Sequence, residues 1–148
     1  MDELVKSMRV TLANTFVFYF KTHGFHWNLE GINFPTYHGF FGDLYEDLHD
    51  AVDPTAEEIR ALGAYAPSGL NELYADATLT DSNIKGENIR EMLVASLSDN
   101  TVLIENLTTV FTIATRENKQ GLADFVAGRI DAHKKHEWML RSCLKGAY

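Results

Sequence analysis

Positive charge, cysteine and long apolar runs are all scarce in this chain of 148 residues. Lysine and arginine together number 13, against 21 aspartates and glutamates, so the formal net charge is −8 at pH 7. A surface of this sign repels the phosphate backbone of nucleic acids, which proteins bind through clustered cations. No basic tail offsets it, because Lys6 stands beside Asp2 and Glu3. At the other end, the last ten residues carry only Arg141 and Lys145. The charge therefore disfavours nucleic-acid binding by this chain alone.

The scarcity of cysteine and of long apolar runs bears on where in the cell the protein is found. A lone cysteine, Cys143, excludes an internal disulfide and suits a reducing environment. The longest apolar run, residues 16–20, is far shorter than the roughly 20 residues that a membrane helix needs. No basic segment leads into an apolar one at the N-terminus, so no secretion signal is visible. We expect a cytoplasmic protein that does not enter a membrane.

What the chain does contain is the composition of an ordinary globular protein. Hydrophobic residues make up 45% and charged residues 23%, which is enough to bury a core and too apolar for a disordered chain. At this length we expect one domain over residues 1–148.

Helical periodicity dominates the sequence, and no segment alternates as a strand would. Apolar residues three and four apart predict a first helix over about residues 2–28. Gly31, Asn33 and Pro35 predict a turn. A second helix over about 36–62 should end at Gly63, followed by a long connection over 64–85 with one short helical turn at 70–74. The last two helices are predicted over about 87–116 and 119–144, with Asn118 as the N-cap of the last.

These elements predict an all-α fold, a ferritin-like four-helix bundle with a long crossover between the second and third long helices. An up-and-down bundle without a cofactor is the alternative. The first helix carries more apolar surface than one buried face needs, through Val17, Phe18 and Phe20. Either this helix is central in its own bundle, or it also packs against a second subunit.

One face of the second helix has the composition of a ligand set. Successive steps of three and four residues align His38, Gly42, Glu46, His49, Asp53 and Glu57. A charged face is often merely solvated, but the two imidazoles favour metal binding. His38 and Asp53 are fifteen residues apart, so about 22 Å of straight helix separates them, too far for one metal within a chain.

Antiparallel packing of two copies across a two-fold axis would bring these groups together. His38 would then face Asp53 of the partner subunit, and Gly42 would face the partner's His49. Each dimer would hold two identical sites, and the surplus apolar surface of the first helix fits such a contact.

The available ligands suit iron, manganese or zinc, and one cysteine cannot form a thiolate site. No HExxH pattern occurs, and Glu46 with His49 is the lone Glu-x-x-His pair, so a di-iron centre inside the bundle is poorly supported. An objection comes from Pro54. Asp53 could cap a separate helix that begins with this proline, and would then not be a ligand.

Three blocks resemble the Dps family, the DNA-protection or miniferritin branch of the ferritin-like proteins. They are FHWNLEGINFPTYH at 25–38, LHDAVDPTAEEIRALG at 48–63 and RIDAHKKHEWMLRS at 129–142. The resemblance implies that His26 and His38 bind iron at a two-fold interface with Asp53 and Glu57 of the partner subunit. It also implies a homo-oligomer, a hollow twelve-subunit shell built from such dimers. That shell would be a ferroxidase that oxidises Fe²⁺ to Fe³⁺, usually with hydrogen peroxide and alternatively with oxygen, and stores the ferric product.

The chain departs from the family pattern in two places. Gly42 stands where the family commonly has an aspartate that helps to hold a second iron, and Asp43 is turned about a third of a revolution away. We suggest that the partner's His49 fills the space opposite Gly42. The basic tail through which many relatives coat DNA is absent, so DNA binding is not expected.

Other residues carry weaker expectations. Trp27, Tyr37 and Tyr45 could intercept radicals or simply pack. By resemblance, Asp124 and Asp131 could line iron-entry pores at three-fold axes, although exposed solubilising carboxylates would look the same. His133 and His136 form a second but weak ligand pair, and residues 138–140 are expected in the core.

Three functions remain in competition. An iron-oxidising storage shell that protects against oxidative damage is the expected one. A metal-free, inactive helical assembly is favoured by Gly42 and Pro54. A DNA-compacting protein is disfavoured by the net charge.

Overall fold

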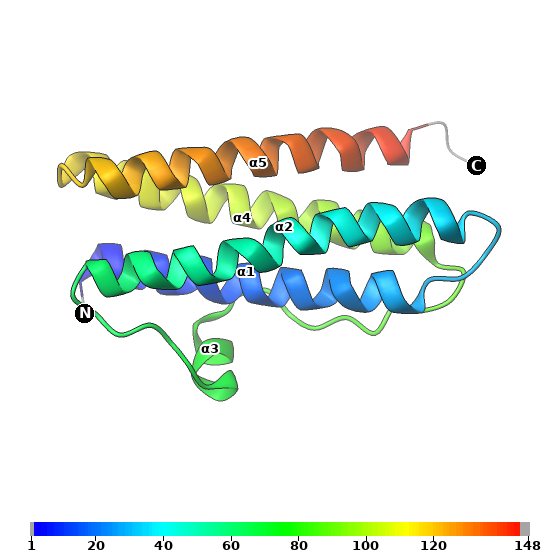
Figure 1. Ribbon diagram of the computed structural model, residues 1–148, viewed down its shortest axis with the longest axis horizontal. Coiled ribbons are helices and arrows are strands. Elements are labelled where there is room, and N and C mark those ends of the chain that lie inside the picture. The colour runs from blue at the N-terminus through cyan, green and yellow to red at the C-terminus, as the bar shows by residue number, and fades with distance from the viewer. Residues whose placement is uncertain (1, 146–148) are drawn as a thin grey trace.

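The computed structural model describes residues 2–145, and in these residues α-helices account for nearly all regular structure. The helices are α1 (Glu3–Asn28), α2 (Phe34–Ala61), α3 (Leu70–Asp76), α4 (Ile89–Arg116) and α5 (Gln120–Leu144). The four long helices run side by side, and short α3 lies outside them in the crossover between α2 and α4 (Figure 1). The predicted all-α four-helix bundle, with a long crossover between its second and third long helices, is therefore confirmed. The helix bounds agree with the predicted ones to within two residues, including the short helical turn, which extends to Asp76.

The helix ends follow from local chemistry. The Asp2 side chain accepts a hydrogen bond of 2.8 Å from the backbone N–H of Val5 and caps α1. Gly63, at φ 89°, ends α2 in the left-handed conformation, as predicted. The predicted N-cap at Asn118 is wrong. This residue has φ 57° and follows Glu117, the C-cap of α4, while Lys119 is the N-cap residue of α5 and makes no side-chain cap hydrogen bond.

Pro54 lies inside α2, which continues unbroken from Phe34 to Ala61. The alternative in which Asp53 caps a separate helix is therefore wrong. Proline removes the N–H that would bond the carbonyl of Asp50. Asp50 is exposed, so water can satisfy that carbonyl and the helix tolerates the ring.

The core forms between α1, α2, α4 and α5, with α1 packed against both α2 and α4. Val17 and Phe18 are buried in this core, whereas Phe20 is 53% exposed. Of the extra apolar residues of α1, two therefore pack inside the bundle and Phe20 faces solvent. The prediction for residues 138–140 was right only for Leu140, since Trp138 is 68% exposed and Met139 42%.

Two buried or half-buried polar side chains of α1 hold the crossover in place. The carboxamide of Asn14 accepts from the backbone N–H groups of Thr78 and Leu79 and donates to the Thr78 hydroxyl, at 2.8–3.0 Å. The guanidinium of Arg9 binds Asp76 at 2.8 Å and Glu72 at 3.1 Å. Among residues 2–145, no helix combines the length and hydrophobicity that a membrane crossing needs.

Candidate metal site

His26, in the last turn of α1, and His38, in the second turn of α2, lie face to face. Their ring centroids are 3.7 Å apart with an interplanar angle of 15°. Nδ1 of His26 lies 2.6 Å from the carbonyl oxygen of His38, and Nδ1 of His38 lies 2.7 Å from the carbonyl oxygen of His26. The two residues therefore hold each other through a reciprocal pair of hydrogen bonds.

This pairing fixes the tautomer of both rings. A carbonyl oxygen can only accept, so each Nδ1 carries a proton and donates it. In the neutral imidazoles, the lone pair then resides on Nε2. Metal-binding histidines in proteins are commonly oriented in this way, by an Nδ1–H bond to a backbone carbonyl. The pair thus presents two Nε2 atoms whose lone pairs could bind a metal.

The same contact gives the His38 side chain a role at the C-terminus of α1. The last four carbonyls of a helix lack intrahelical partners. The carbonyl of Phe25 accepts from Leu29 and that of Asn28 accepts from Gly86, so the His26 carbonyl is left for the His38 imidazole. His38 therefore closes the C-terminus of α1, and the turn at residues 29–33 brings the two histidines together.

Gly42, one turn after His38 in α2, forms the floor beneath His26. A Cβ atom at this position would lie 3.2 Å from both Cε1 and Nδ1 of the His26 ring. The family's aspartate would therefore crowd His26 in this chain. Glycine at this position therefore lets the His26 ring pack closely against α2, and it also provides no carboxylate to the site.

Asp53 and Glu57 project from the second half of α2, where both are exposed. Neither carboxylate makes an ion pair or hydrogen bond with other residues in 2–145. Within one chain they share a helix with His38 and do not meet it. Among residues 2–145, no three histidine, cysteine or acidic side chains of the same chain are placed to hold a metal.

A cluster of rings, the His23 cluster (Tyr19, His23, Trp27, Tyr45 and His49), adjoins His26. His23 stacks on Tyr45, with centroids 3.8 Å apart, and its Nδ1 lies 3.0 Å from the Tyr19 hydroxyl. Burial lowers the pKa of His23, and the neighbouring His26 and His49 lower it further. Sequence reasoning missed His23 and Tyr19. Their spacing of three and seven residues before His26 was the available signal.

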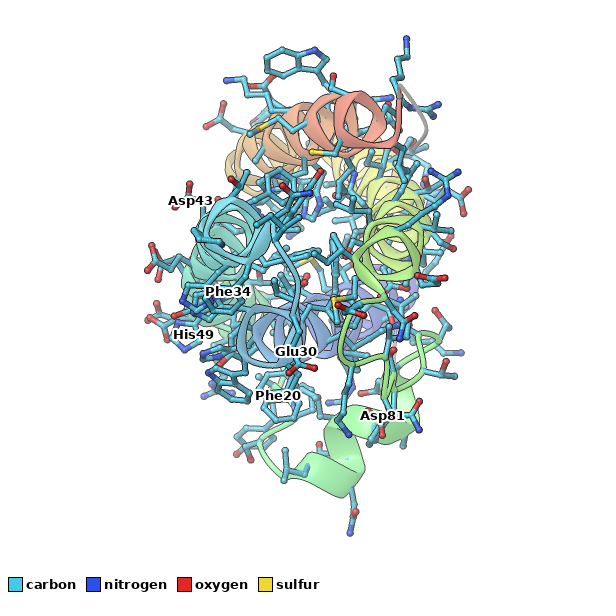
Figure 2. All side chains as sticks on the ribbon, turned by 90° about the vertical axis from the view of Figure 1, so that its right-hand side faces the viewer. Phe20, Glu30, Phe34, Asp43, His49 and Asp81 are labelled. Carbon is cyan, nitrogen blue, oxygen red and sulfur yellow. The ribbon has the colours of Figure 1, made fainter. Side chains whose placement is uncertain are left out.

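Figure 2 shows the side of the bundle on which this cluster lies. His49, Phe34 and Phe20 project along the outer side of α1 and α2, away from α4 and α5. Phe34 stacks on His38, with centroids 4.7 Å apart, and Trp27 is 55% exposed. The two histidines thus border an exposed face that is rich in aromatic side chains.

The other predicted pair, His133 and His136, serves a different purpose inside the bundle. His133 is 1% exposed; its Nδ1 donates to Asn100 at 2.8 Å and its Nε2 accepts from Arg129 at 3.3 Å. His136 donates to Asp47 at 2.7 Å, and Arg129 binds both oxygens of Asp47 at 2.9 and 3.0 Å. Both ring nitrogens of His133 and Nε2 of His136 thus have protein partners, so the two imidazoles do not form a ligand pair.

The pKa values reflect this network. Burial lowers the pKa of His133 well below its usual range, helped by Arg129 and His136 and opposed by Asp47. Burial alone would raise the pKa of Asp47, but hydrogen bonds from His136 and Arg129 hold it well below its usual range. We conclude that His133 is neutral and that Asp47 is ionised at neutral pH.

A second ion pair crosses the bundle from α1 to α4. Lys21 Nζ lies 2.8 Å from Oδ2 of Asp99, and each side chain is 9% exposed. That oxygen has no hydrogen bond of good angular geometry among residues 2–145, so the contact is mainly ionic. Burial raises the pKa of Asp99 against the opposing effect of Lys21.

The candidate pore residues lie on the surface of α5. Asp124 is exposed, and Asp131 pairs with Lys135 at 3.3 Å. A role for either in iron entry stays a prediction.

Comparison with known proteins agrees with this architecture. The model of the ferritin-like domain matches residues 6–147. The DNA protection during starvation protein of Brevibacillus brevis is 30% identical over 134 residues, which are 90% of this chain and 89% of that protein. The DNA protection during starvation protein 2 of Bacillus anthracis is 28% identical over 142 residues, 96% of this chain and 97% of that protein.

A solved structure is similar over nearly the whole chain. It is the Dps protein from Vibrio cholerae O1, which is described as a member of a broad superfamily of ferritin-like diiron-carboxylate proteins. Its TM-score is 0.91 at 26% identity, over 97% of this chain and 89% of the other. The chain belongs to the Dps family of ferritin-like proteins, as the three sequence blocks predicted.

Proposed function

We propose that this protein oxidises ferrous iron at sites shared between two subunits and stores the ferric product inside an oligomeric shell. The observation that carries the proposal is the reciprocal hydrogen bonding of His26 and His38, which leaves two Nε2 lone pairs on an exposed face. Two imidazoles supply only part of a coordination shell, because iron takes four to six ligands. The other ligands must come from residues other than His26 and His38.

The acidic part of the site is assigned to Asp53 and Glu57 of the partner subunit. Both carboxylates are exposed and unpaired in residues 2–145, on the helix that carries His38. An antiparallel, two-fold pairing of α2 brings them opposite the partner's histidines, and an isologous interface repeats the site twice. Exposed Phe20 and Trp27 border the same face and offer apolar area for the contact.

The ligand set fits the chemistry of iron oxidation. Carboxylates from the partner's Asp53 and Glu57 offset the extra charge when Fe²⁺ becomes Fe³⁺, and neutral imidazoles bind both states. In our assignment, the partner's Glu57 bridges two ions, His26 and the partner's Asp53 hold the tighter one, and His38 the looser. Two ferrous ions can then reduce one hydrogen peroxide to two waters, with two protons taken up, and release no hydroxyl radical. Storage would follow in a twelve-subunit shell, and the acidic surface favours iron over DNA as cargo.

A subunit-mixing experiment tests the shared site. We expect His26→Ala and Asp53→Asn to oxidise ferrous iron no faster than buffer when each is assembled alone. A co-assembled equal mixture contains dimers in which one site combines an intact histidine with an intact aspartate. Activity should return to about one quarter of wild type, because half of the dimers are mixed and each has one complete site.

The control is a mixture of His26→Ala with His38→Ala, in which every site lacks one histidine. This mixture should stay inactive. An equally active control would contradict the shared site, and single variants with wild-type rates would contradict the proposed function. Light scattering must show the same particle size for all samples.

A further inference from the structure

The His23 cluster contains a hydrogen bond that packing alone does not require. We propose that Tyr19 is a one-electron donor that quenches oxidising radicals formed at the His26–His38 pair, with His23 accepting the phenolic proton. The proposal rests on the proposed function only for the source of the oxidant. It assigns a protective activity to residues that bind no iron.

The contacts form a continuous path from the metal-binding pair. The ring of Tyr45 lies with its centroid 5.2 Å from that of His26. On its other side, Tyr45 stacks on His23 at 3.8 Å and with an interplanar angle of 10°. The Tyr19 hydroxyl then lies 3.0 Å from Nδ1 of His23, and the rings of Tyr19 and Tyr45 are 6.1 Å apart. An electron can therefore move from Tyr19 through Tyr45 to the pair, between rings in contact.

The proton acceptor distinguishes Tyr19 from the other aromatic side chains. A phenol becomes a strong acid when it loses an electron, so its oxidation is favoured where a base already accepts the hydroxyl proton. In the tautomer with its proton on Nε2, His23 accepts from Tyr19 through Nδ1. Trp27 also contacts His23, at 4.1 Å between ring centroids, but its indole N–H has no acceptor among residues 2–145. Trp27 is also 55% exposed, whereas Tyr19 is half-buried between Phe16, His49 and Tyr45.

A hydroxyl radical forms when one ferrous ion reduces peroxide by a single electron. It takes one electron from Tyr45 and becomes hydroxide. Tyr45 regains its electron from Tyr19, whose O–H bond breaks as the proton passes to Nδ1 of His23. His23 then returns this proton through the solvent to the hydroxide, so the products are one water and a neutral tyrosyl radical on Tyr19.

An oxidant supplied from outside tests the donor independently of iron chemistry. The assembled protein, free of iron, would be oxidised by flash photolysis of a ruthenium complex with persulfate and then frozen for electron paramagnetic resonance. We expect a tyrosyl radical, which narrows when the protein contains ring-deuterated tyrosine. The signal should be lost in Tyr19→Phe and retained in Tyr65→Phe, since Tyr65 is 79% exposed on the crossover. An equal signal in Tyr19→Phe, or a tryptophan radical alone, would overturn the proposal.

The second arm uses ferrous iron with peroxide. Tyr19→Phe should oxidise iron at the wild-type rate but release more hydroxyl radical to a spin trap, and Tyr45→Phe should do the same while keeping the stack on His23. Unchanged trapping in both variants would overturn the proposal. If wild type does not oxidise iron at all, the proposed function fails, and the photochemical arm still decides the role of Tyr19.

Discussion

The imidazole of His26 rests directly on Gly42, where an added Cβ would lie 3.2 Å from two of its ring atoms. Gly42→Ala should therefore displace the ring and weaken its hydrogen bond to the His38 carbonyl. Loss of such an orienting bond lowers metal affinity by about 10- to 100-fold. We expect ferrous binding, measured by anaerobic calorimetric titration, to weaken within that range.

Gly39→Ala is the matched control, because it lies in the same helix and has no atom within 4 Å of an added Cβ. Its affinity should equal that of wild type. Equal affinities for all three proteins would show that the contact between His26 and Gly42 does not position the ligand.

Sequence periodicity was sufficient to predict the bundle, because each long helix has a sustained apolar stripe and clear stop signals. The pairing of His26 with His38 was instead implied by the resemblance of three sequence blocks to the Dps family. The second helix was predicted to run through Pro54, and α2 does so, but the sequence left a separate helix capped by Asp53 open as an alternative. The prediction that Trp138 lies in the core was wrong because an apolar residue in a helix need not belong to its buried face, and Trp138 is 68% exposed.

The interior polar network was also beyond sequence reasoning. No sequence pattern marks Asp47, yet it binds both Arg129 and His136, which are more than eighty residues away along the chain. Only the packing of α5 beside α2 creates this contact. Long-range polar pairing leaves no periodic signal, and this is why His133 and His136 were considered as ligands.

His49 offers a test of how the second iron is held. It is an exposed side chain of α2, and antiparallel pairing would bring the partner's His49 opposite Gly42. We expect His49→Ala to bind one ferrous ion per site where wild type binds two, because His38 and the partner's Glu57 are then the only side chains assigned to the looser ion. Iron titration followed by absorbance would measure the ratio, with exposed Glu46→Gln as control. An unchanged ratio would exclude His49 as a ligand.

His133 should make stability fall as the pH falls. Its pKa is lowered by burial, so below about pH 6.5 the unfolded chain gains a proton that the folded chain does not. The free energy of unfolding should then decrease by up to about 1.4 kcal/mol per pH unit from this group. Asp47 does not change the free energy of unfolding between pH 6.5 and 5, because its pKa is lowered in the folded state and it stays ionised there.

Urea unfolding at a fixed protein concentration would measure this slope between pH 7 and 5. His133→Gln keeps one donor and one acceptor but cannot be protonated, so its slope should be shallower whatever its absolute stability. Parallel slopes for the two proteins would mean that another group carries the dependence.

The ion pair between Lys21 and Asp99 should matter most when only one partner is removed. Lys21→Met leaves a buried carboxylate without its cation, and such losses destabilise proteins by about 3–5 kcal/mol. Replacing both partners, as Lys21→Met with Asp99→Leu, also removes the desolvated charge and should restore most of the stability. Chemical unfolding of the single and double variants would measure the difference. A double variant as unstable as Lys21→Met would mean that the aliphatic chain of Lys21, and not its charge, supports the contact between α1 and α4.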